Sequence, residues 1–423
     1  MEPPHMQVDD IDLSDFDFWT QPPDLIEGAF ATLRRERPIA FFEEPVAELL
    51  PPGRGYWALT RYADVVEASR HPDLFCSGRG TNIGDMPDSF NEFFGSMINL
   101  DDPRHARMRR IVSRGFTPRQ LDSFRSDVEA TAAGIVDDII ERGECDLVTE
   151  VAALLPLRII VDMMGLPRSE EKFIFDRTNV ILGLGDPEYV PDQTEAGIMT
   201  AALTAGQELA SLVSELGEAR QREPGADLVS ALVTAEVDGE TLSPLELGSF
   251  FILLVVAGNE TTRNAIAHGV HALSEHPEQK ALWASDIEAV TPTAVEEIVR
   301  WSTPVIHFRR TVTRDGVRLG DHEFSEGDKV VLWYKSANRD DAVFDEPYRF
   351  DVKRSPNDHL GFGGPGPHFC LGAHLARREV SVMFRELLTR LPDLHTSAPP
   401  DRLRSNFING VKHLPVAWTP QPS

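Results

Sequence analysis

Hydrophobic residues recur with a helical period along most of the chain. Over residues 120–222 apolar positions repeat every three to four residues, with breaks at 165–167 and 183–187. The longest such segment opens with Ser243, a proline and Glu246, the pattern of a capping box, and it continues to about residue 276. At 1.5 Å per residue, these roughly 33 residues span about 50 Å. We therefore expect one long helix that crosses the whole molecule.

A few short segments have the pattern of strands instead. Residues 39–42 and 56–60 are rich in aromatic and β-branched residues and are separated by a Pro-Pro-Gly turn, which predicts a strand pair. Short runs of the same kind alternate with Gly-containing turns between residues 304 and 335. Residues 62–70 again predict a helix. The pattern therefore predicts a mostly α protein with a small β region.

The length of 423 residues would allow two or three domains, but no linker, repeat or low-complexity block divides the chain. Residues 1–22 are acidic and contain prolines near their end. We expect a loosely held acidic arm over residues 1–22 and a single domain over residues 23–423.

Composition excludes several classes of partner. The net charge of −27 argues against nucleic acid or an anionic membrane as a ligand. The longest uninterrupted apolar run, residues 250–257, is too short to cross a bilayer, and the first 19 residues carry acids where a signal peptide needs basic and then apolar residues. Three widely spaced cysteines fit a reducing compartment. We therefore expect a cytoplasmic protein with no membrane anchor.

One cysteine follows a glycine- and proline-rich loop, HLGFGGPGPHFC at residues 359–370, and a predicted helix comes directly after it. Unpaired N–H groups and the macrodipole at a helix N-terminus favour the thiolate of Cys370, which suits a metal. Zinc would need further ligands at short spacing, whereas Cys76 and Cys145 have no cysteine partner nearby. A lone thiolate in a glycine cradle is typical of haem iron that activates oxygen. The alternative is a buried structural cysteine after a turn.

The loop resembles the haem-binding loop of the cytochrome P450 family, Phe-Gly-x-Gly-x-His/Arg-x-Cys-x-Gly. Phe362 lies eight residues before Cys370, one more than in the common pattern. This longer form is similar to that of some bacterial members that oxidise lipids and steroids. The resemblance implies the cytochrome P450 fold and a haem b whose iron is bound by Cys370.

The centre of the long helix interrupts its own apolar pattern. Residues 257–262 read AGNETT, and a glycine followed by polar residues in a buried helix is locally unfavourable, as expected at functional sites. The segment resembles the oxygen-binding groove of the same family, which implies that Glu260 and Thr261 are the catalytic acid and alcohol of proton delivery. Alternatively, Thr261 bonds to the carbonyl of Ala257 and only bends the helix. Both can hold together.

A helix is predicted over residues 103–115, where a proline follows an aspartate N-cap. His105 and Arg109 are four residues apart and share one face of it, so they can clamp a carboxylate together. The resemblance places such a pair against the haem propionates. It implies that Arg310 and His368 bind the same groups.

Arg107, Arg110 and Arg114 fall on the opposite side of that helix. Six arginines and no acid lie between residues 103 and 120 of this strongly acidic chain. We therefore interpret the three arginines as a docking patch for an acidic redox partner. The simpler alternative is a solvated face.

Two further segments carry predictions of structure. Glu297 and Arg300 lie on a helix predicted to begin at residues 291–292, and the resemblance implies a buried ion pair completed by Arg349. Residues 77–99 are irregular and contain Phe90, Phe93, Phe94 and Met97. They form either a wall of the substrate channel or a loop that places aromatic side chains in the core.

Together these motifs imply a haem-thiolate monooxygenase that inserts one oxygen atom of O2 into a C–H bond. Electrons from NAD(P)H would arrive through a ferredoxin reductase and a ferredoxin, as the resemblance implies. Residues 250–264 and 96–105 look like those of actinobacterial enzymes that hydroxylate methyl-branched lipids at the terminal carbon. The alternatives are hydroxylation of a sterol or steroid side chain and a haem-thiolate binding protein without turnover.

Overall fold

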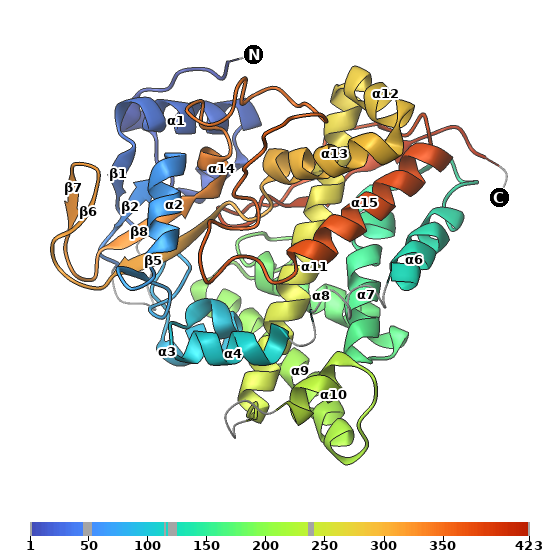
Figure 1. Ribbon diagram of the computed structural model, residues 1–423, viewed down its shortest axis with the longest axis horizontal. Helices are drawn as coiled ribbons and strands as arrows, with labels where there is room; N and C mark the ends of the chain where they lie inside the picture. The colour runs from blue at the N-terminus through green and yellow to red at the C-terminus, as the bar shows by residue number, and fades with distance from the viewer. Residues whose placement is uncertain (1, 45–52, 114–115, 117–124, 236–240, 422–423) are drawn as a thin grey trace.

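Helices make up most of the structure, a computed structural model that describes residues 2–44, 53–113, 116, 125–235 and 241–421 (Figure 1). The helices are α1 (Pro23–Glu36), α2 (Tyr62–Arg70), α3 (Asp88–Gly95), α4 (Arg104–Ser113), α6 (Arg125–Asp137), α7 (Leu154–Met164), α8 (Glu171–Leu182), α9 (Glu195–Arg222), α10 (Leu228–Thr234), α11 (Pro244–Glu275), α12 (Pro277–Ser285), α13 (Ile287–Ser302), α14 (Tyr334–Ala337) and α15 (Ala373–Arg390). The prediction of a mostly α protein is confirmed.

The strands are short and form small sheets at the edges of the helical body (Figure 1). They are β1 (Ile39–Phe42), β2 (Tyr56–Leu59), β3 (Phe75–Cys76), β4 (Glu144–Asp146), β5 (His307–Val312), β6 (Val317–Leu319), β7 (His322–Phe324), β8 (Lys329–Trp333), β9 (His395–Thr396), β10 (Asp401–Arg402), β11 (Val411–His413) and β12 (Pro415–Ala417). The small predicted β region is confirmed as well.

The long helix α11 runs through the middle of the molecule, and α7, α9, α13 and α15 pack against it (Figure 1). The predicted capping box is present, because the Ser243 hydroxyl accepts from the Glu246 N–H and the Glu246 carboxylate accepts from the Ser243 N–H. By length and composition α11 could cross a membrane, but 61% of its most apolar stretch is buried inside the protein. It therefore has the character of a core helix.

The largest sheet has the strand order β1-β2-β8-β5-β3, in which only β2 and β8 run parallel. β1 and β2 form the predicted pair, with Ile39 opposite Leu59. Successive side chains of a strand point to opposite faces. On β5 this alternation turns Arg310 towards the interior, while Arg309 binds the backbone of the segment between Arg79 and Asp85.

The N-terminal segment is not loosely held, and that prediction is wrong for residues 11–19. Leu13 is fully buried, Trp19 is 3% exposed, and the Trp19 ring stacks on Trp333 of β8 with centroids 5.3 Å apart. The acidic composition misled the prediction because the acids alternate with large apolar side chains that can be buried while the carboxylates face water. The division into an arm over 1–22 and a single domain over 23–423 stays a prediction.

Two predicted boundaries also differ from the structure. Residues 77–99 are not an irregular loop throughout, since they contain α3 and a 3-10 turn over Ser96–Asn99. α13 begins at Ile287 instead of residue 291, because the Asp286 carboxylate caps it by accepting from the Ala289 N–H. Pro292 therefore lies inside the helix.

Candidate functional site

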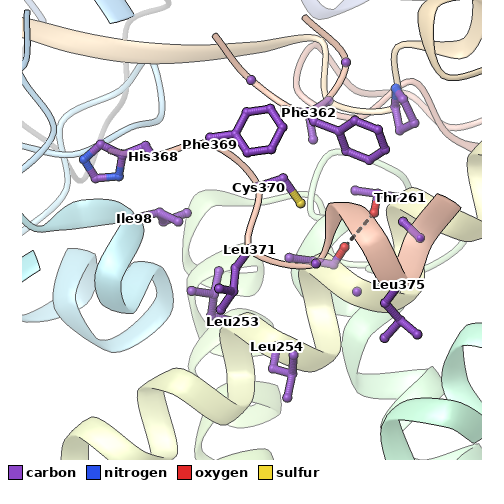
Figure 2. Close-up of a pocket in the computed structure, with 18 of the residues that line it drawn as sticks. Ile98, Leu253, Leu254, Thr261, Phe362, His368, Phe369, Cys370, Leu371 and Leu375 are labelled. Atoms are coloured by element: carbon purple, nitrogen blue, oxygen red, sulfur yellow. Dashed lines mark hydrogen bonds between the residues drawn. The ribbon is translucent and has the colours of Figure 1, made fainter. Parts of the chain in front are cut away.

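A cavity lies in the middle of the molecule, where α11 faces residues 361–372 and the first turns of α15 (Figure 2). The volume that the centres of water molecules could occupy in it is about 240 Å³. Most of the lining is apolar, and α11 supplies a large part of it. Apolar residues of the wall include Ile98, Ile160, Phe250, Leu253, Leu254 and Phe308.

The aromatic segment at residues 88–99 contributes both to this wall and to the core. Met97 and Ile98 line the cavity. Phe93 and Phe94 instead pack against the main hydrophobic core, where a side chain at Gly206 of α9 would collide with them. The placement of aromatic side chains against the core is confirmed for Phe93 and Phe94, while a role of this segment in a substrate channel stays a prediction.

Glycines shape the loop that carries Cys370. Gly363 and Gly366 have φ angles of +87° and +148°, which other residues rarely adopt. A Cβ on Gly366 would also approach the carbonyl oxygen of Ser69 to 2.4 Å. The Cys370 N–H donates to the carbonyl of Phe362 at 3.0 Å, which closes the loop. The sulfur is thereby fixed at the wall of the cavity, directly before α15 (Figure 2).

The surroundings of Cys370 act on the pKa of its thiol in opposite directions. Burial raises the pKa of the Cys370 thiol, and the Gly372 N–H and the guanidinium groups of Arg109 and Arg377 only partly oppose this rise. A cation bound directly to the sulfur would stabilise the thiolate.

The four predicted propionate-binding residues meet at one end of the cavity. His105 and Arg109 come from α4, Arg310 from β5 and His368 from the Cys370 loop, and all four line the cavity. The rings of His105 and His368 lie 4.2 Å apart between centroids. Burial, followed by the nearby Arg310, lowers the pKa of His368 to about 2, and burial lowers that of His105 as well. Both imidazoles are therefore neutral at pH 7.

Among the described residues, neither Arg109 nor Arg310 forms an ion pair at this end of the cavity, while the exposed Asp102 approaches His105 Nδ1 to 3.5 Å. Arg310 is 5% exposed and donates to the carbonyl of Arg309, and Arg109 donates to the carbonyl of Phe369 at 2.6 Å. His105 Nε2 is buried and has no hydrogen-bond partner among the described residues. Buried cations and orphaned donors are costly unless something pairs with them. The donor set therefore fits an acidic ligand such as the propionates of haem.

One arginine of the proposed docking patch has partners inside the protein. Arg107 is held at the start of α11, where it donates to Glu246 and to the carbonyl of Thr241, both at 2.8 Å. Arg110 is exposed on α4, and Arg114 lies outside the described residues. The docking interpretation is therefore wrong for Arg107, whose charge is used inside the protein.

The centre of α11 separates the two side chains that sequence analysis paired. Thr261 lines the cavity, and its hydroxyl donates to the carbonyl of Ala257 at 2.7 Å, which is the helix-bending contact considered above (Figure 2). Glu260 is 1% exposed, forms an ion pair with Arg263 and accepts from Asn264 at 2.9 Å. It is not among the described residues that line the cavity.

The chain is similar to known proteins over nearly its whole length. The family model described as cytochrome P450 matches residues 173–412. A methyl-branched lipid omega-hydroxylase of Mycobacterium tuberculosis is 51% identical over 422 residues, which cover 99% of this chain and 96% of that protein. The chain belongs to the cytochrome P450 family. A steroid C26-monooxygenase of Rhodococcus jostii is 40% identical, with 92% of this chain and 81% of the relative covered.

Solved cytochrome P450 structures have the same fold. A Mycobacterium marinum cytochrome P450 in complex with pseudoionone superposes with a TM-score of 0.92 at 39% identity, covering 98% of this chain and 99% of that one. A Bacillus megaterium enzyme in complex with corticosterone gives a TM-score of 0.79 at 29% identity, with 92% and 97% covered. The predicted cytochrome P450 fold is confirmed, and the protein is an oxidoreductase of the monooxygenase class.

The buried ion pair of this cytochrome P450 is completed by a different arginine from the predicted one. Arg300 binds both carboxylate oxygens of Glu297, at 2.7 and 2.8 Å. Arg354 supplies the second guanidinium at 3.2 Å. Arg349 is about half exposed and pairs with Glu346, while its carbonyl accepts from both buried arginines. The motif over residues 344–350 therefore identified the right segment of the chain, but the side chain that pairs with Glu297 is that of Arg354.

Glu379 and Thr262 are among the polar residues of the cavity to which the sequence analysis gave no role. Glu379 of α15 and Thr262 of α11 both line the cavity and contact each other. A signal was present: Glu379 lies four residues from both Leu375 and Met383, on the apolar face of its helix. An acid on the apolar face of a helix is expected to be buried, and a buried acid is a candidate for a functional role.

Proposed function

We propose that this protein hydroxylates the terminal carbon of a methyl-branched lipid, with haem b bound in the cavity. The observation that supports this most strongly is the chemistry of the cavity wall. A lone cysteine faces an apolar surface of α11 in which Thr261 is one of few polar groups. Such a wall suits a hydrocarbon chain, and the methyl-branched lipid omega-hydroxylase is a close relative over nearly the whole chain.

The residues that would hold haem have separate tasks. Cys370 would ligate the iron, and His105, Arg109, Arg310 and His368 would bind the propionates through N–H groups. When bound, haem b supplies the redox-active iron that activates O2. The apolar side chains of α11 and of residues 97–98 would hold the lipid and exclude bulk water.

A binding and product assay tests the choice of substrate. We expect methyl-branched fatty alcohols or acids to shift the haem absorption spectrum and to yield products oxidised at the terminal carbon, whereas unbranched lipids of equal length bind more weakly. A sterol with an intact side chain is the second candidate, because its side chain also ends in a methyl branch and a steroid C26-monooxygenase is a relative. Preference for the sterol would favour that function, and preference for unbranched chains would refute both.

Thr261 would hold a proton at its Oγ1 for the reduction of O2. If so, Thr261→Ala should keep haem and lipid binding but release peroxide while nicotinamide is still consumed. If the hydroxyl serves only the carbonyl of Ala257, alanine should leave product and consumed cofactor in step. Measuring product, peroxide and nicotinamide oxidation in one reaction distinguishes the two roles.

Electrons would come from NAD(P)H through a ferredoxin reductase and a ferredoxin, and the protein would work in the cytoplasm. We infer that the ferredoxin docks beside the Cys370 loop, over the exposed Arg110 of α4. Arg110→Glu should slow reduction by an acidic ferredoxin at low ionic strength, and salt should diminish the difference. Arg35→Glu, the same change at an exposed arginine of α1, is the matched control. Equal rates for both variants would contradict this docking site.

A further inference from the structure

Ser77 contacts one of the cavity residues from behind the wall. It directly follows β3, is fully buried, and is not among the described residues that line the cavity. Its hydroxyl lies 3.2 Å from Nε2 of His368, which does line the cavity. The other ring nitrogen of His368, Nδ1, makes no hydrogen bond with any residue that the structure describes. Ser77 therefore occupies one nitrogen of this ring and leaves the second to the cavity.

The backbone of Ser77 is fixed by its own hydrogen bonds. Its N–H and that of Gly78 donate to the two carboxylate oxygens of Asp101, at 2.8 and 2.9 Å. Its carbonyl accepts from the N–H of Gly80 at 2.9 Å. A Cβ on Gly78 would lie 2.6 Å from Oδ2 of Asp101, so a larger residue there would push the carboxylate away. The carbonyl of Asp101 accepts from the N–H of His105 at 2.9 Å, which ties Ser77 to the start of α4.

The two histidines at this end of the cavity share one pattern. His105 turns Nδ1 towards Asp102, at 3.5 Å, and its Nε2 is buried without a hydrogen-bond partner in the described part of the chain. His368 turns Nε2 towards Ser77 and has Nδ1 unpaired among the same residues. The centroids of the two rings lie 4.2 Å apart. In each ring, one nitrogen is held by a side chain of the protein and the other has no described partner.

The ring of His368 depends on such a partner for its orientation. The torsion between Cβ and the ring has two broad minima, and half a turn about it would place carbon atoms where the nitrogens lie. The Ser77 hydroxyl can select one of these orientations because backbone hydrogen bonds fix its own position. When the hydroxyl donates to Nε2, the proton of a neutral imidazole lies on Nδ1, which can then donate.

We propose that Ser77 is a positioning residue, which holds the ring of His368 so that Nδ1–H points at a carboxylate of the bound cofactor. The inference rests on the proposed haem site and concerns its propionates. Ser77 lies behind the cavity wall, so its effect passes through His368. Loss of the hydroxyl would let the ring rotate and would weaken the bond to the propionate, while Cys370, Arg109 and Arg310 stay in place.

Transfer of haem to apomyoglobin measures how tightly the propionates are held. Ser77→Ala should speed this transfer about tenfold, because the hydrogen bond from His368 to a charged carboxylate is weakened. Ser302→Ala removes the hydroxyl of a similarly buried serine in α13, which binds the carbonyl of Ile298, and is the matched control. The control should transfer haem at the rate of the unchanged protein. Equal rates for the two variants would overturn the proposal.

A second substitution at the same position separates hydrogen bonding from packing. Ser77→Cys keeps nearly the same volume, but a thiol is only a weak donor. We expect this variant to lose haem nearly as fast as Ser77→Ala. If it retained haem as well as the unchanged protein, the volume of the side chain would matter instead of its hydroxyl, and the proposed role would be wrong.

Two further comparisons tie the effect to His368 and to the carboxylates. In a His368→Phe background, Ser77→Ala should no longer change the transfer rate, because the residue through which it acts is gone. With haem dimethyl ester, whose carboxyl groups carry no charge, Ser77→Ala should lose most of its effect. A full effect in either case would refute the route through His368. If the unchanged protein takes up no haem, the proposed function fails, irrespective of Ser77.

Discussion

Two groups of buried basic side chains lie in the core of this protein, and they differ in how many hydrogen-bond partners the described residues provide. Arg300 is fully buried and donates five hydrogen bonds, two to Glu297 and three to the carbonyls of Asn338, Pro347 and Arg349. At the end of the cavity where the four predicted propionate-binding residues meet, Arg310 is nearly as buried and donates to the carbonyl of Arg309. His105 Nε2 there has no hydrogen-bond partner among the described residues.

The difference shows how a structural charge cluster can be told from a binding site. An arginine whose five donors are all used needs nothing further, so the Glu297 centre is complete in the folded chain. Cations and donors that remain unpaired in a buried place indicate a missing anion, since burial without a partner is costly. The first cluster therefore stabilises the fold, and the second has the donors that an anionic ligand would need.

The largest effect is expected from breaking the complete cluster. Arg300→Ala leaves the buried carboxylate of Glu297 with only part of its partners, which should lower the free energy of unfolding by about 3 to 5 kcal/mol. Urea unfolding followed by circular dichroism measures the change. A loss below about 1 kcal/mol would mean that this pair behaves like a surface ion pair.

Glu379 is a third case, a buried acid without a charged partner, and its effect depends on pH. In the folded protein its pKa is about 8, above the ordinary value of 4.5, so the folded state keeps a proton that the unfolded state loses. Stability from this group is thus fully present below pH 4.5 and is lost as pH rises to about 8. The stability of Glu379→Gln relative to the unchanged protein should therefore rise by a few kcal/mol over that range. Urea unfolding at several pH values should show this, and a pH-independent difference would contradict it.

Removing a donor from the incomplete cluster should affect haem retention more than folding. His105→Leu takes away the orphaned Nε2 together with the 3.5 Å contact of Nδ1 with the exposed Asp102, so the free energy of unfolding of the haem-free protein should change little. Loss of a hydrogen bond to a charged propionate, worth about 1.5 to 3 kcal/mol, should speed haem transfer to apomyoglobin by roughly tenfold to a hundredfold. A haem-free protein as destabilised as Arg300→Ala would show that this cluster is structural too.

The smallest effect is expected at the arginine that sequence analysis preferred. Arg349 pairs with Glu346 where both side chains are more than half exposed. Arg349→Ala should change the free energy of unfolding by about 0.5 kcal/mol or less, because exposed ion pairs contribute little. Arg349→Ala is also the control for Arg300→Ala. If both variants lost the same free energy of unfolding, the buried and the exposed ion pair would not differ in their contribution to stability.

The motifs that depend on backbone conformation were readable from the sequence. Only glycine adopts the φ angles at Gly363 and Gly366 readily, and a serine, a proline and a glutamate at fixed spacing define the start of α11. The positions of Cys370 and Thr261 at the cavity followed from these local rules and from the family resemblance. The N-terminal segment was misjudged because its net acidity hid the apolar residues that pack on β8.

The sequence by itself determined the family, the helical framework and the cysteine loop, because capping, glycine conformation and hydrophobic period are local properties of the chain. Tertiary structure decided which charges meet. It gave Glu297 the guanidinium of Arg354 instead of Arg349, bound Arg107 to Glu246, turned Glu260 from the cavity and placed Glu379 in its wall. Side-chain partners and desolvation depend on helices that are distant in sequence, and no local pattern specifies them.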